Sequence, residues 1–111
     1  MEIKHELLKR CVLFTVEGRI DSSTAPDLQQ KMNGIIDQGN FKVVVDLRGV
    51  DFISSAGLWV LVNAQKKCKR FNRGEVVLSG VSQRVHDALN LAGFIPYFNI
   101  HDDTAKAVGS F

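Results

Sequence analysis

The sequence predicts an α/β fold in which helices pack against a small mixed, mainly parallel β-sheet. Segments rich in β-branched and aromatic residues alternate along the chain with segments whose apolar residues recur at helical spacing. A helix between two strands acts as a crossover, so most neighbouring strands are expected to run parallel. The length of 111 residues, of which 45% are hydrophobic and 23% charged, suits one globular domain over residues 1–111.

The first predicted elements are a hairpin and a helix. Strands are expected at residues 3–8 and 12–17, where β-branched and aromatic residues gather. Ser23 or Thr24 can cap the helix that follows, and Gly39 is expected to end it. Its apolar residues form a helical stripe: Ala25, Leu28, Met32, Ile35 and Ile36.

The centre of the sheet is predicted at residues 42–48. Val43, Val44 and Val45 follow one another without polar alternation, which is typical of a strand covered on both faces. A helix then extends to about Phe71, and the cations of the run KKCKR lie near its C-terminal end, where the helix dipole favours them. One face of this helix is apolar: Val60, Leu61, Ala64, Cys68 and Phe71.

The last part of the chain predicts two further strands and two further helices. A short strand is expected within residues 74–80, followed by a helix that Ser82 caps and Gly93 ends. The inward residues of that helix are expected to be Val85, Ala88, Leu89 and Ala92. A brief strand at 97–100 and a short helix within 102–111 complete the order β, β, α, β, α, β, α, β, α.

The stretch DFISSAGLW, residues 51–59, lies between the central strand and its helix. Free peptide N–H groups and the positive end of the helix dipole favour an anion there. Either Ser54 or Ser55 can serve as the N-cap, and capping is the simplest interpretation. Capping needs only one hydroxyl, however, and the small Ala56 and permissive Gly57 leave the other within reach of another protein's active site. Phosphorylation there would add about −1.5 to −2 charge units and alter any partner surface that faces the turn.

Trp59 is the large aromatic residue nearest to these serines. In helical projection it shares a face with Asn63, Lys66 and Arg70, away from the centre of the core stripe. Two interpretations are open: Trp59 forms a small apolar contact surface with Val62, or its ring lies flat beneath a neighbouring loop.

Other classes of function have weaker support. The motif ISSAG lacks the G-x-S-x-G elbow of a serine hydrolase, and His5, His86 and His101 are scattered, so no enzyme activity is expected. No phosphate-binding glycine motif is present, and Cys11 and Cys68 have no metal-ligand spacing, so neither cofactor nor metal is expected. A net charge of +2 does not indicate nucleic-acid binding, and no apolar run reaches the length of a membrane span. We therefore expect a cytoplasmic protein.

The segment VVVDLRGVDFISSAGLWVL resembles the signature of STAS domains, in particular of bacterial anti-sigma factor antagonists. The segments VEGRIDSSTA, GEVVLSGVSQRVHDALNLAGF and DDTAKAV extend the resemblance over nearly the whole chain. It implies a small β-sheet with α-helices on one side. It also implies partner switching, in which the unmodified antagonist binds an anti-sigma factor and so frees a sigma factor for transcription. The anti-sigma factor is also an ATP-dependent serine kinase whose phosphorylation of the antagonist ends the association, and a PPM-type phosphatase resets the cycle.

The resemblance also assigns site residues. The family's acceptor serine lies two positions before the glycine of the turn, which makes Ser55 the expected phosphorylation site. The partner-binding residues are expected to be Asp21, Ser54, Ala56, Gly57, Trp59 and Val62. Ser54 stands where the family commonly has Asp, and Trp59 stands where the residue is often small.

Two alternatives remain open. A non-phosphorylated STAS subunit of a lipid or toluene transport complex, or of a signalling scaffold, would use Trp59 and Val62 as a permanent interface. A hydrolase would use Ser54 or Ser55 as its nucleophile. The chain is expected to be a monomer or a weak dimer.

Overall fold

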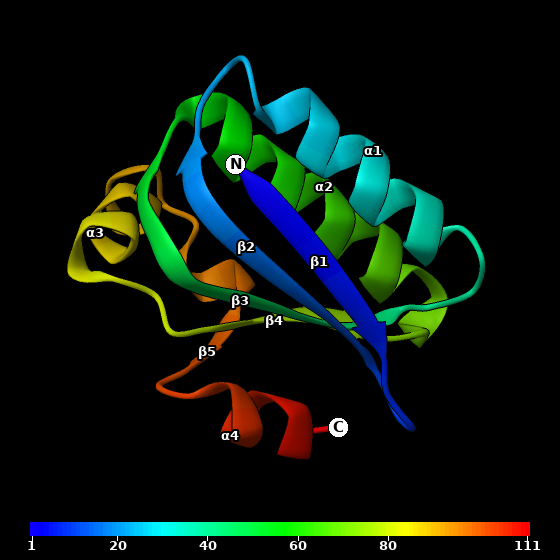
Figure 1. Cartoon of the computed structure of the whole chain (residues 1–111). Coiled ribbons are helices and arrows are strands. Elements are labelled where there is room, and N and C mark those ends of the chain that lie inside the picture. The colour runs from blue at the N-terminus through cyan, green and yellow to red at the C-terminus, as the bar shows by residue number, and fades with distance from the viewer.

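The computed structural model describes residues 1–111 as a five-stranded mixed sheet in the order β1-β2-β3-β4-β5, with helices packed on it (Figure 1). The strands are β1 Glu2–Leu7, β2 Val12–Ile20, β3 Lys42–Ile53, β4 Glu75–Ser79 and β5 Asn99–His101. The helices are α1 Ala25–Ile36, α2 Ser55–Lys69, α3 Gln83–Leu91 and α4 Thr104–Gly109, with 3-10 turns at Arg70–Asn72 and Ile95–Tyr97. β1 and β2 are antiparallel and the other neighbours are parallel, which confirms the predicted α/β fold.

Both faces of the central strand are covered, as the unbroken valines predict. Val43 and Val45 point into the main core beneath α1, α2 and α3. Val44 points to the opposite face and packs in a smaller cluster with Val77 and with Ala107 of α4. The three longer helices thus lie on one side of the sheet, as the family resemblance implies, and α4 is the exception (Figure 1). Successive side chains of a strand point to opposite faces of the sheet, so Val44 faces away from the three longer helices and is buried by α4 instead.

The end of α2 differs from the prediction. The helix stops at Lys69, because Arg70 has an extended backbone (ψ 129°) and Phe71 and Asn72 have positive φ angles of 59° and 55°. Phe71 was expected on the apolar face of the helix, but its side chain is 77% exposed. The left-handed backbone turns the ring away from the core.

The last strand is also displaced from its predicted position. Ile95–Tyr97 form a 3-10 turn, and β5 therefore begins at Asn99 instead of residue 97. α4 follows as predicted, with the Asp103 side chain accepting a hydrogen bond from the Lys106 N–H at 2.8 Å. At α3 the predicted cap is confirmed, since Ser82 Oγ accepts a hydrogen bond from the Val85 N–H.

Gln65 is a buried polar residue on the core side of α2 and was not among the predicted core residues. Its side-chain amide accepts a hydrogen bond from the Val76 N–H at 2.6 Å and donates to the carbonyl oxygens of Val76 and Tyr97 at 3.0 and 2.7 Å. β5 pairs with β4 only from Val77 onward. The amide of Gln65 therefore satisfies the backbone of β4 just before the point where β5 begins, and it ties the turn at Tyr97 to the core.

Candidate functional site

The predicted site lies where β2 and β3 end. The two strands run parallel and finish together, with Ile20 paired to Ile53. The Ser54 N–H continues the pairing by donating to the Ile20 carbonyl at 2.8 Å. Asp21 and Ser54, the residues that follow the two strands, are consequently neighbours at the carboxyl edge of the sheet, next to the start of α2.

The two serines of the turn have different structural roles. Ser54 is the N-cap of α2: it is half-buried, and its Oγ accepts a hydrogen bond from the Gly57 N–H at 3.3 Å. Ser55 is the first residue of the helix, its side chain is exposed, and its hydroxyl has no hydrogen bond to the rest of the chain. The choice of cap that the sequence left open thus falls on Ser54. The hydroxyl of Ser55 is free and accessible to another protein.

Two of the residues expected to bind a partner are buried instead. Val62 is 1% exposed and belongs to the main core, so the prediction that it forms a surface with Trp59 is wrong. Gly57 is also buried, and a Cβ atom there would lie 2.5 Å from Ile20 Cγ2 and 2.8 Å from Ile53 Cγ1. The reason is that α2 packs on the sheet and alongside α1, so more than a narrow stripe of it is covered. Gly57 permits the close approach that places Ser55 at the edge of the sheet.

Replacement of Gly57 by alanine is expected to lower the free energy of unfolding by about 1–3 kcal/mol, because the added methyl group overpacks against Ile20 and Ile53. Gly34→Ala is the matched control, since a Cβ at Gly34 of α1 has no neighbour within 4 Å. Alanine there is expected to stabilise the helix by up to about 1 kcal/mol. Urea denaturation of both variants measures the two changes, and equal effects would show that Gly57 has no packing role.

Trp59 lies one helical turn after Ser55 and is 49% exposed. Its ring packs edge-on against Phe94 with centroids 5.3 Å apart, and Phe94 in turn packs against Tyr97 at 5.9 Å. We call Trp59, Phe94 and Tyr97 the aromatic ladder. Tyr97 is 48% exposed, so the ladder presents two partly exposed rings at its ends. Trp59 therefore contacts the loop after α3 without lying beneath it, and the ladder takes the place of the predicted pair with Val62.

Asp21 is held in a tight turn before α1. Its Oδ1 accepts hydrogen bonds from the Ser23 hydroxyl at 2.6 Å, from the Ser23 N–H at 3.0 Å and from the Thr24 N–H at 3.1 Å. These bonds, above all that from the Ser23 hydroxyl, lower the pKa of the Asp21 carboxyl group. Its Oδ2 lies 4.0 Å from Arg19 Nε, and the side chain is one-third exposed. The carboxylate is thus charged, fixed in position and accessible beside the serine turn.

The lowered pKa of Asp21 gives stability that depends on pH. Because its carboxyl group is more acidic in the folded state, the stabilisation is present above the unfolded-state pKa of about 3.9 and is lost as the pH falls through the folded-state value. The stability that such a carboxylate contributes is lost progressively between about pH 5 and pH 1. We therefore expect the free energy of unfolding of Asp21→Asn to fall less than that of the wild type between pH 5 and pH 2. Chemical denaturation at several pH values measures this difference, and parallel curves for the two proteins would contradict it.

The turn has the geometry and charge that a phosphoryl acceptor requires. Ser55 supplies the free hydroxyl, Ala56 beside it is small and exposed, and the first turn of α2 contains no acidic residue that would repel a phosphate.

The chain contains no group of three or more His, Cys, Asp or Glu residues arranged to hold a metal ion. None of its helices combines the length and the apolar character that crossing a membrane requires.

Comparison with known proteins identifies the family. The STAS domain model matches residues 2–107. A Bordetella bronchiseptica protein named as an anti-sigma factor antagonist, BtrV, is 27% identical over 111 residues, which are 100% of this chain and 95% of that protein. An anti-sigma factor antagonist from Mycobacterium paratuberculosis has the same fold, with a TM-score of 0.89, 22% identity and coverage of 98% of this chain and 92% of that chain.

The anti-sigma factor antagonist SpoIIAA is similar in two solved forms. The unphosphorylated form has a TM-score of 0.84 and 16% identity, and the match covers 98% of this chain and 95% of that chain. The phosphorylated form, from Bacillus, has a TM-score of 0.77 and 15% identity, with 98% of each chain covered. The STAS domain model matches residues 2–107, and the strand order of the structure is consistent with this match. The chain therefore belongs to the STAS domain family.

Proposed function

We propose that this protein is an anti-sigma factor antagonist whose binding to its partner is controlled by phosphorylation of Ser55. The observation that carries the proposal is the free, exposed hydroxyl at the first residue of α2, next to a second serine that already serves as the cap. The names of the similar proteins support it, and so does the existence of SpoIIAA in both phosphorylation states. The domain acts as a binding protein, and its partner supplies the catalysis.

The chemistry of the proposed reaction is phosphoryl transfer. A kinase, which we take to be the anti-sigma factor itself, moves the γ-phosphoryl group of ATP to Ser55 Oγ: the new P–O bond forms, the bond to the β-phosphate bridging oxygen breaks, and ADP leaves. The hydroxyl proton passes to a base of the kinase. Hydrolysis by a PPM-type phosphatase would return the free hydroxyl and release inorganic phosphate.

A phosphate at Ser55 would change the surface more than the fold. The group lies in solvent at the positive end of α2, where the helix dipole favours negative charge. A partner surface fitted to the neutral hydroxyl would instead have to bury about −1.5 to −2 charge units. Binding is therefore expected to weaken while the domain stays folded.

The aromatic ladder extends the proposed contact surface. Trp59 lies one turn from Ser55, and partly exposed aromatic side chains often contribute most of the binding energy of an interface. Asp21 follows the strand that pairs with Ser54 and carries a fixed negative charge. A partner that covers Ser55 would thus have both an aromatic surface and a carboxylate nearby.

The direct test is to incubate the protein with its anti-sigma factor and ATP and to map the phosphate by mass spectrometry. Phosphate is expected on Ser55 and is expected to disappear in Ser55→Ala. Ser54→Ala is the matched control: it removes the cap, at about 1 kcal/mol, but leaves the acceptor in place. Phosphate on Ser54, or none on the wild type, would contradict the proposal, and co-purification with a transporter ATPase in place of a kinase would favour the transport alternative.

A further inference from the structure

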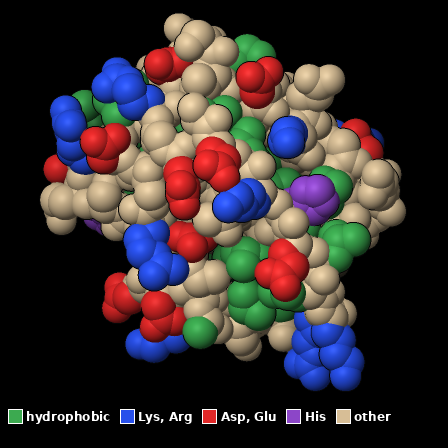
Figure 2. Space-filling model, in the orientation of Figure 1, with side chains coloured by type: hydrophobic (Ala, Val, Ile, Leu, Met, Phe, Trp, Pro, Cys, Tyr) green, Lys and Arg blue, Asp and Glu red, His purple; other side chains and the backbone are tan.

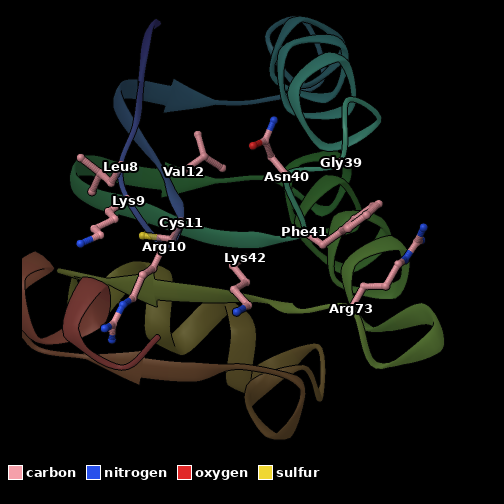
Figure 3. A pocket seen from close by; sticks show the side chains of 10 residues that line it. All are labelled: Leu8, Lys9, Arg10, Cys11, Val12, Gly39, Asn40, Phe41, Lys42 and Arg73. Carbon is pink, nitrogen blue, oxygen red and sulfur yellow. The ribbon is translucent and has the colours of Figure 1, made fainter.

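A cationic hollow lies at the end of the sheet opposite to Ser55. It has a volume of about 220 Å³ and is bordered by the loops that lead into β2 and β3 and by Arg73 (Figure 3). Four cations surround it, namely Lys9, Arg10, Lys42 and Arg73, and no acidic residue lines it. α2 separates it from the serine turn by about 22 Å, the length of a 15-residue helix. The hollow is therefore distinct from the proposed partner surface.

Ion pairs with Asp or Glu side chains do not compensate the charge of this hollow. None of the four cations forms an ion pair with an Asp or Glu side chain. Arg10 donates one exposed hydrogen bond, to the backbone oxygen of Phe111 at 3.4 Å. Two carboxylates near this end have hydrogen-bonding or ion-pair partners of their own: Asp37 pairs with Lys67 at 2.6 Å, and Glu75, which faces Lys42 in the β3–β4 register, accepts a hydrogen bond from Asn99 at 3.0 Å. Like charges gathered without counter-charges repel one another, so an anion that bound between them would be stabilised.

Figure 2 shows where part of this charge lies on the surface. Cationic side chains project at the lower right of the view, at the place where Figure 1 has the turn between β1 and β2. That turn carries Lys9 and Arg10. In Figure 3 the side chain of Lys42 lies between Arg10 on one side and Arg73 on the other. The cations therefore surround the hollow on several sides, as contact with more than one anionic group requires.

Arg73 is the cation whose position is fixed. Its guanidinium carbon lies 3.7 Å from the centre of the Phe41 ring, its Nε donates to the Arg70 carbonyl at 3.1 Å, and a terminal nitrogen donates to the Lys67 carbonyl at 3.1 Å. A planar guanidinium held in this way is well suited to phosphate, because little freedom is lost on binding. The two preceding residues, Phe71 and Asn72, have the left-handed backbone that side chains adopt only at a cost. The local backbone thus maintains an unfavourable conformation next to the hollow.

We propose that this hollow binds a small anion with more than one phosphate group. Several cations arranged around one volume favour a multivalent anion over a single chloride or carboxylate, because each further charge adds a contact. The phosphate chemistry could come from pyrophosphate or from the phosphate chain of a nucleotide. The exposed ring of Phe71, 5.7 Å from the Arg73 guanidinium, offers a stacking surface for a base in the second case.

Titration of the full chain with pyrophosphate, followed by NMR chemical shifts and calorimetry, tests the proposal. Saturable binding is expected, with the largest shifts in residues 9–12, 40–42 and 73. ADP serves as the second arm: a Kd at least tenfold lower than that of pyrophosphate would identify a nucleotide as the ligand class, and similar Kd values would show that the phosphates alone are recognised. Absence of saturable binding by either probe would overturn the proposal.

Substitutions separate this hollow from general surface charge. Arg10→Gln combined with Lys42→Gln removes two exposed cations that make no ion pair with Asp or Glu, at the loss of one exposed hydrogen bond from Arg10 to Phe111. The fold is therefore expected to be kept, and the Kd for pyrophosphate is expected to rise at least tenfold. Lys31→Gln, an exposed cation of α1 away from the hollow, is the control and should leave the Kd unchanged. Equal effects of both replacements would overturn the proposal. Because no step involves Ser55, these results are independent of the phosphorylation test.

Discussion

Ser55→Asp is expected to weaken binding to the anti-sigma factor by at least about 30-fold. An unpaired charge placed within an interface costs upward of about 2 kcal/mol, and every 1.4 kcal/mol is a factor of ten in Kd. Phosphoserine carries more charge than aspartate, so phosphorylated wild type should bind more weakly still. Calorimetry with the purified partner measures both values. The single tryptophan of the chain, Trp59, gives a second readout, because its fluorescence should change when the partner covers it.

The stability of this variant separates a surface effect from a folding effect. The Ser55 side chain is exposed at the positive end of α2, so aspartate there is expected to leave stability unchanged or raise it by about 0.3–1 kcal/mol. Gln38→Glu adds the same charge after α1, at the opposite end of the sheet, and should not affect binding. An unchanged affinity of Ser55→Asp, or an equal loss in Gln38→Glu, would contradict the partner surface proposed around Ser55.

The sequence predicted the strands and helices well because each carries a local signal. Val43, Val44 and Val45 indicated a strand buried on both faces, and the structure places two of them under the long helices and one under α4. The pair Ser54 and Ser55 indicated a cap with a spare hydroxyl. Which serine served as the cap depended on where the helix begins, and that boundary is set by the pairing of the Ser54 N–H with β2.

The errors of the sequence analysis arise where burial depends on contacts between distant segments. A helical projection places Val62 beside Trp59, but it cannot show that α2 packs against both the sheet and α1 and so covers Val62. The aromatic ladder was missed for the same reason, since Phe94 and Tyr97 reach Trp59 only through the fold. The burial of Gln65 could have been predicted from the sequence. It stands one turn after Leu61 in the apolar stripe of the helix, where a polar side chain requires a buried hydrogen-bond partner.

Gln65→Met is expected to lower the free energy of unfolding by about 3–5 kcal/mol. Methionine has a similar volume, so the packing is nearly kept, but the Val76 N–H and the carbonyl groups of Val76 and Tyr97 lose their partner. A buried group left without its hydrogen bond costs about 1–3 kcal/mol. The melting temperature should fall by more than about 10 °C. Urea and thermal denaturation measure the change, with Gln29→Met on the exposed side of α1 as the matched control, expected within about 0.5 kcal/mol of wild type.

The same substitution links the core to the proposed partner surface. Gln65 donates to the Tyr97 carbonyl, and Tyr97 packs against Phe94, which in turn packs against Trp59. Loss of the amide should therefore loosen the aromatic ladder and shift the Trp59 emission toward that of a solvated indole, even at temperatures where the domain remains folded. A destabilised protein with unchanged emission would show that Gln65 supports only β4, and a loss of stability below about 1 kcal/mol would show that water replaces the amide at Val76.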